Sequence, residues 1–160
     1  MRLIERSREF AEIGFSEREL VALNNALALA LVRCDEQDME ILSGSSAAEM
    51  KKLQSALSSM VSRDSGRASE RGVESARRHE WHFFSAVCLR ADEEEMVVRL
   101  GTSALLALGN SLTIVRGWLG PGDAKTLLLC DDDELLSLLR DIRTLATHPK
   151  RAARRRPDTR

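Results

Sequence analysis

The alternation of apolar and polar residues before position 16 predicts a short strand, and the pattern after it predicts a helix. Ala11, Ile13 and Phe15 would share one face of the strand. Ser16 and Glu19 then form a capping box, in which each side chain satisfies a free backbone amide at a helix start. Apolar residues at helical spacing continue this helix to about residue 33: Leu20, Leu23, Leu27, Ala30 and Leu31.

Two further helices are expected in the first half of the chain. Residues 36–43 form a short one, and Gly44 is positioned to end it in the left-handed conformation. Ser46 and Glu49 make a second capping box. The third helix carries a stripe at Met50, Leu53, Leu57 and Met60.

The second half predicts the same order of elements. Residues 96–100 alternate like a strand, and Thr102 or Ser103 is positioned to cap the helix that follows. A Gly-Pro-Gly turn at 120–122 precedes a short helix over 123–129, and Asp131 with Glu134 caps the last helix, which Pro149 ends. The apolar positions of this half are Met96, Val98, Leu100, Leu105, Leu108, Leu112, Val115, Leu135, Leu138, Ile142 and Leu145.

The two halves align without a gap when Leu20 is placed on Leu105, a displacement that we call the repeat offset. Nine of the 42 positions from 19 to 60 are then identical. Eight positions expected in the core are apolar in both halves: 20, 23, 27, 42, 50, 53, 57 and 60. Two unrelated helix trios with one period would also give some matches, but the shared placement favours a tandem duplication.

The predicted fold is therefore mainly α, an α+β protein with two short strands. Each repeat would be one strand plus three helices, related by a pseudo-twofold axis that pairs the two strands. The repeats span residues 9–61 and 81–147, joined by a charged linker over 62–80, and a basic, disordered tail covers 148–160. The aromatic stretch 81–89 fits either a short strand or a buried helical turn.

Composition limits the functional classes. The 160 residues are 43% hydrophobic and 31% charged, with a net charge of −1, so the chain as a whole is not a polyanion binder. Three widely spaced cysteines without a C-x-x-C motif predict free thiols in a reducing compartment. Since neither a signal peptide nor a membrane span is evident, we expect a soluble, cytoplasmic protein that does not bind membranes.

The segment Leu20-Val-Ala-Leu-Asn-Asn-Ala-Leu27, with the short helix, Gly44 and the final helix behind it, resembles small uncharacterised bacterial helical proteins of about this unit size. The resemblance covers a single repeat unit and implies no function. The second half departs from it, with Gly109 in place of the first Asn and Cys130 near the turn.

Asn25 and Asn110 recur at the same point of the repeat, although Asn is a mediocre helix former. Each amide is expected to bond across to a neighbouring helix or strand, or else to contact a ligand or partner. His79 and His82 lie three residues apart near Cys88, but this spacing fits no established zinc motif, so we expect neither a metal nor a cofactor.

Charged segments supply the other candidates. The acidic helix start Asp131, Asp132, Asp133 and Glu134 would suit a basic partner. The basic tail, with Arg154, Arg155 and Arg156, would suit nucleic acid or an acidic partner.

No nucleophile–base order, phosphate loop or H-E-x-x-H motif is present, so we do not expect an enzyme. The leading hypothesis is a protein–protein interaction module, such as a bacterial adaptor, antitoxin or immunity protein, acting as a monomer or homodimer. The first alternative is a small DNA-binding regulator that uses the helix-turn-helix-like hairpin of residues 36–60 and the basic tail. A second alternative binds a small molecule in a groove between the repeats.

Overall fold

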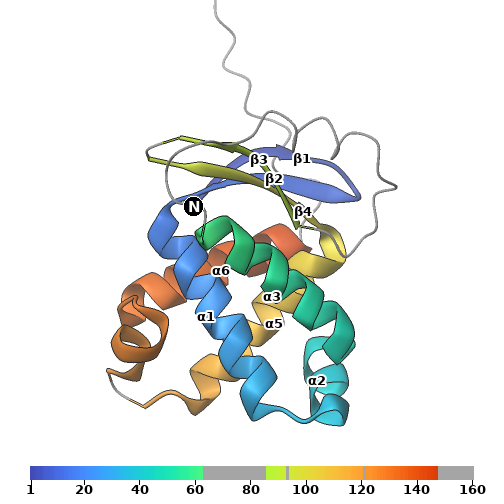
Figure 1. Cartoon of the computed structure of the whole chain (residues 1–160), viewed down its shortest axis with the longest axis vertical. Coiled ribbons are helices and arrows are strands. Elements are labelled where there is room, and N and C mark those ends of the chain that lie inside the picture. The colour runs from blue at the N-terminus through green and yellow to red at the C-terminus, as the bar shows by residue number, and fades with distance from the viewer. Residues whose placement is uncertain (63–85, 93, 121, 148–160) are drawn as a thin grey trace, which may run out of the picture.

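The computed structural model describes residues 1–62, 86–92, 94–120 and 122–147. A four-stranded antiparallel sheet forms one layer, and the described helices pack together on one of its faces (Figure 1). The first half contributes β1 (Arg2–Arg6), β2 (Phe10–Phe15), α1 (Glu17–Arg33), α2 (Glu36–Ser43) and α3 (Ala47–Val61). The second contributes β3 (Ala86–Ala91), β4 (Met96–Gly101), α5 (Thr102–Trp118), the π-helical turn η1 (Ala124–Leu128) and α6 (Asp132–Thr147).

The sheet has four strands within the described residues, where two were predicted. The predicted strands correspond to β2 and β4, which pair with each other at the centre of the order β1-β2-β4-β3. The edge strand β1 was missed altogether. The other edge strand, β3, includes Val87, Cys88 and Leu89, for which the sequence left strand and helix open. The α+β class is thus confirmed, with more strand than expected.

The repeat offset aligns the strand pairings as well as the sequence. In the central pair Ile13 lies opposite Val98, which is its own equivalent in the second half. The edge pairs follow the same rule: Leu3 lies opposite Ile13 in one half and Cys88 opposite Val98 in the other. Each edge strand also shifts register at the same place, between Leu3 and Glu5 and between Cys88 and Arg90.

Helix boundaries follow the predicted caps closely. Ser16 and Ser46 form complete capping boxes with Glu19 and Glu49, and Gly44 ends α2 with a φ of 71°. One predicted cap is wrong. Gly101 is the N-cap of α5, while the Thr102 hydroxyl donates to the Arg8 carbonyl across 3.0 Å and so ties the helix start to the β1–β2 turn.

The short helix predicted over 123–129 is present as the five-residue π-helical turn η1. It ends at Leu129, whose φ of 60° is a left-handed conformation that a leucine rarely adopts. The equivalent position in the first half is Gly44, which adopts this conformation readily. The short helices α2 and η1 therefore both end in a left-handed backbone conformation, at Gly44 in the first half and at Leu129 in the second.

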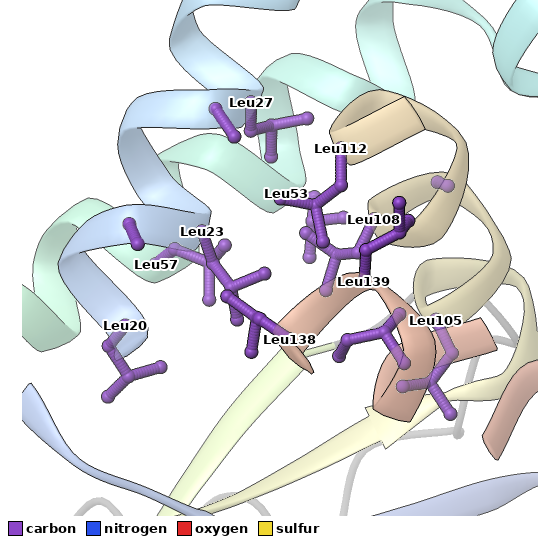
Figure 2. Packing of buried hydrophobic residues seen from close by; sticks show 14 of the residues in the cluster. Leu20, Leu23, Leu27, Leu53, Leu57, Leu105, Leu108, Leu112, Leu138 and Leu139 are labelled. Atoms are coloured by element: carbon purple, nitrogen blue, oxygen red, sulfur yellow. The ribbon is translucent and has the colours of Figure 1, made fainter. Parts of the chain in front are cut away.

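One hydrophobic core joins both halves. Leucines from α1, α3, α5 and α6 point toward one another beneath the sheet (Figure 2). Seven of the eight predicted core positions are buried in both halves. Position 42 is the exception, since Leu42 is 49% and its counterpart Leu127 is 45% exposed. The short helices bury Met39 and Ser43, and Ala124 and Leu128, in their place.

The short helices cross between the halves. The first half's α2 packs on α5, while η1 packs on α1, and α1 and α5 also contact each other. The halves therefore share both a sheet and a helical layer, and each short helix contacts the other half as well as the last helix of its own half.

Candidate functional site

Asn110 has a structural partner. Its side-chain amide donates to the carbonyl of Ser43 at 3.0 Å. Ser43 is the last residue of α2, where carbonyls lack partners within the helix. Asn110 thus caps the C-terminal end of α2 from the other half of the chain. A hydrogen bond to a neighbouring helix was one of the two roles expected for this side chain.

The other asparagine of the pair behaves differently. Asn25 is half-buried and its side chain makes no hydrogen bond to the described residues. Its neighbour Asn24 is the residue that bonds between helices, accepting from the Ser58 hydroxyl at 2.8 Å. Asn24 gives no repeated signal in the sequence, because its counterpart is Gly109, which lies against Ile142 of α6.

The acidic helix start is exposed, and part of it serves the fold. Asp131 and Glu134 form the predicted capping box: the Glu134 amide donates to Asp131 at 2.8 Å and the Asp131 amide to Glu134 at 3.0 Å. Arg18 Nη1 lies 3.8 Å from Glu134 Oε1. Asp132 and Asp133 lie in the first turn, where the helix dipole favours negative charge. The pKa of the neighbouring Cys130 thiol is raised, mainly by burial and in addition by the nearby carboxylates of Glu134 and Asp131.

Several of the predicted candidates lie outside the described residues. These are the tail arginines Arg154, Arg155 and Arg156, the histidines His79 and His82, and most of the linker. Within the described ranges, no three His, Cys, Asp or Glu side chains come close enough together to hold a metal ion.

An open hollow of about 680 Å³ runs along α6 and not between the halves. Its walls mix leucines with charged and hydroxyl side chains: Asp133, Leu136, Leu139, Arg140, Arg143, Thr144 and Thr147. Since one helix supplies them all, the hollow does not correspond to the groove between repeats that a small-molecule binder was expected to use.

Two of the ion pairs in the described structure lie on the face of the sheet that points away from the helices. Glu12 accepts from Arg99 Nε at 2.9 Å, and the Arg99 guanidinium lies 4.5 Å from the centre of the Phe10 ring. On the same face, nearer the other end of β2, Glu95 accepts from Arg2 Nε at 3.0 Å and lies 3.9 Å from Arg90 Nη2. Glu95 also lies over Gly14, where a Cβ atom would overlap its carboxylate.

Hydrogen bonds lower the pKa values of two acids near the start of β4, Glu95 and Asp92. The hydrogen bond from Arg2 holds the pKa of Glu95 below its ordinary value, and backbone amides of Glu95 and Glu94 do the same for the pKa of Asp92.

Exposed apolar side chains gather where the first helix of each half meets the second. Six of the nine large hydrophobic side chains that are exposed in the described structure lie at the ends of α1 and α5, in the short helices or directly after η1. The first half contributes Val32, Ile41 and Leu42, and the second contributes Trp118, Leu127 and Leu129. We call these the α2 surface and the η1 surface.

The carboxylates of the α2 surface are a feature that sequence reasoning overlooked. Asp35, which caps α2, and Glu36, Asp38 and Glu40 within the helix are all exposed. The signal was available, because no Lys or Arg occurs between positions 34 and 50.

Comparison of the chain with protein-family models, with curated proteins and with solved structures gives no match. In the part of the chain that the structure describes, no helix combines the length and apolarity needed to cross a membrane.

Proposed function

We propose that this chain is a non-enzymatic protein–protein interaction module that docks through its short second helices. The observation that carries the proposal is the exposure of Leu42 and Leu127, which are leucine at equivalent positions and yet 49% and 45% exposed. Keeping apolar side chains in water is unfavourable, and clusters of them on a soluble protein mark contact sites. An adaptor, antitoxin or immunity role fits a small chain that acts by binding.

The proposed scaffold is a tandem duplication of a ββααα unit about a pseudo-twofold axis. Support comes from the repeat offset, which is the same in the sequence, in the strand register and in the edge irregularities. The crossed packing of α2 on α5 and of η1 on α1 is what a homodimer of single units would have before its subunits were fused. Two related docking helices would then have been inherited together.

Both edges of the sheet are poorly suited to binding a partner by strand addition. Each edge strand is irregular at the same point, and Ile4 and Leu89 are the residues skipped by the pairing. Bulges of this kind twist an edge and interrupt its row of free backbone groups. The helical layer is therefore the better candidate for a docking surface.

Affinity capture from cells that produce the protein tests the proposal. The double variant Leu42→Ser/Leu127→Ser removes the shared exposed leucines, and Leu106→Ser/Leu136→Ser removes two leucines of similar exposure from α5 and α6 as a matched control. We expect a protein partner to be retained by the wild type and the control and lost from the first variant. Identical captures by all three would contradict docking through these helices.

The DNA-binding alternative predicts another outcome. A gel shift at low salt that disappears when residues 150–160 are deleted would favour a regulator, because phosphate contacts are strongly salt-dependent. The hairpin of α2 and α3 does place Lys51 and Lys52 on an exposed stretch of α3, and exchanging both for Gln would then weaken the shift as well.

A further inference from the structure

The α2 helix turns one apolar face to the core and another away from it. Met39 and Ser43, four residues apart, form the buried face against α5. Ile41 lies on the opposite side of the helix and is 71% exposed. Asp38 precedes Ile41 by three residues and Leu42 by four, so these three side chains are neighbours on one outward face. The outward face is thus apolar with an acid beside it.

Acids lie on this face and on one flank of α2 without cations to neutralise them: Asp38 is on the face itself, and Glu36 and Glu40, four residues apart, are on the flank. Within the described ranges, Asp35, Glu36, Asp38 and Glu40 form no ion pair with a Lys or Arg side chain. Asp35 serves the fold, because its Oδ1 accepts from the Asp38 amide at 2.8 Å and caps the helix. The carboxylates of Glu36, Asp38 and Glu40 remain available to a partner.

The fold does not require this combination, since the second half lacks it. At the repeat offset, Glu36 corresponds to Pro121, Glu40 to Lys125 and Ile41 to Thr126. Val32 at the end of α1, which is 81% exposed, corresponds to Gly117. Only Asp38 and Leu42 are kept, as Asp123 and Leu127. Glu36 and Glu40, and the exposed apolar side chains of Ile41 and Val32, are therefore specific to the first half.

We infer that the α2 surface binds a basic amphipathic segment of a partner protein, in which Leu-like side chains cover Ile41 and Leu42 while Lys or Arg side chains pair with Glu36, Asp38 and Glu40. This inference rests on the proposed function and assigns it to one of the two surfaces. The unpaired carboxylates make a basic partner the favoured one, because opposite charge across an interface speeds association and increases selectivity. The same carboxylates repel nucleic acid and anionic membranes.

Direct binding to a defined probe tests this inference without a partner in hand. The probe is a fluorescent amphipathic peptide of leucine and lysine, and the control peptide has glutamate in place of lysine. Fluorescence anisotropy at about 50 mM salt would show binding of the lysine peptide to the full chain, and binding should weaken at about 500 mM because the charges are screened. Binding of both peptides alike would overturn the inference.

Matched variants locate the site. Ile41→Ser/Leu42→Ser removes the apolar part and Glu36→Gln/Asp38→Asn/Glu40→Gln the charge, and we expect each to weaken binding by about tenfold or more. The controls are Leu106→Ser/Leu136→Ser on α5 and α6 and Asp132→Asn/Asp133→Asn on α6, which should leave binding unchanged. Circular dichroism checks that each variant is folded. Loss of binding only in a control variant would place the site elsewhere and overturn the inference.

The basic tail is the competing occupant. If deletion of residues 148–160 strengthens peptide binding by tenfold or more, the tail of the chain occupies the α2 surface and the inference about a partner fails. Unchanged binding supports it. A partner captured from cells through Leu127 but not through Ile41 and Leu42 would refute this inference while leaving the proposed function standing, whereas the absence of any captured partner would count against both.

Discussion

Ile13 and Val98 lie opposite each other in the central strand pair and occupy equivalent positions of the two aligned halves. On either side of them, Ala11 faces Leu100 and Phe15 faces Met96, which are the same two repeat positions taken from opposite halves. A twofold axis through the Ile13–Val98 pair would produce this register. The core beneath it should therefore respond to substitution in the same way in both halves.

Substitutions Leu23→Ala and Leu108→Ala test this equivalence. Both leucines are fully buried at related positions in one core, so each should lower the free energy of unfolding by about 2–5 kcal/mol. Urea unfolding followed by circular dichroism should remain a single transition in each variant. Val32→Ala, at an exposed position, is the control and should change stability by less than about 0.5 kcal/mol. Two separate transitions would show that the halves unfold independently.

Separate expression of the halves tests the shared sheet. A cut between residues 75 and 76 leaves β2 and α2 on one fragment and their partners β4 and α5 on the other. We expect the co-expressed fragments to copurify as a one-to-one complex, because each covers core surface that the other would leave in water. Fragments that fold and purify separately would contradict this.

Asn110→Ala should be more costly than Asn25→Ala. The first change leaves the Ser43 carbonyl without the Asn110 amide, and losing such a bond costs about 0.5–1.5 kcal/mol. The second removes a half-buried side chain that has no hydrogen bond to the described residues. Chemical unfolding of the two variants in parallel measures the difference. Equal losses would mean that the cap of α2 contributes little.

The Arg2–Glu95 pair should make stability depend on acid. Arg2 lowers the pKa of Glu95 below the ordinary 4.5 of a glutamate, so the pair stabilises the fold above that pH and the contribution is lost as pH falls through the lowered pKa. In Arg2→Gln, an NMR titration should find the pKa of Glu95 closer to 4.5. Stability should then fall less between pH 5 and about pH 2 than in the wild type. An unchanged titration of Glu95 would show that Arg2 does not hold the carboxylate in solution.

Much of the helical layer was predictable because its signals are local. Ser16, Ser46 and Gly44 fix helix ends through their own side chains or backbone, and leucine spacing identifies the buried stripes. The edge strand β1 was not predictable in this way. Its register shift leaves Leu3 facing inward and Ile4 exposed, so the strict alternation that predicts a strand is lost.

The candidate site was harder to predict because tertiary packing decides it. Position 42 looked like core from its helical spacing, but α2 is short and turns Met39 and Ser43 toward α5. Asn24 gave no repeated signal, and Thr102 caps no helix because its hydroxyl bonds to Arg8. The α2 acids are evident in the sequence. Their place in the proposed docking surface depends on the exposure of Ile41 and Leu42, which only the structure shows.

Under the proposed duplication, the ion pair between Glu12 and Arg99 illustrates what joining two related units in one chain would permit. Its counterpart across the central pair is Val97 facing Gly14, which are the same two positions with unrelated side chains. In two identical subunits a new residue appears at both places and must suit both. In a single chain a substitution appears only once. One half can then gain a new interaction, such as the Glu12–Arg99 ion pair, while the equivalent positions of the other half keep their original packing.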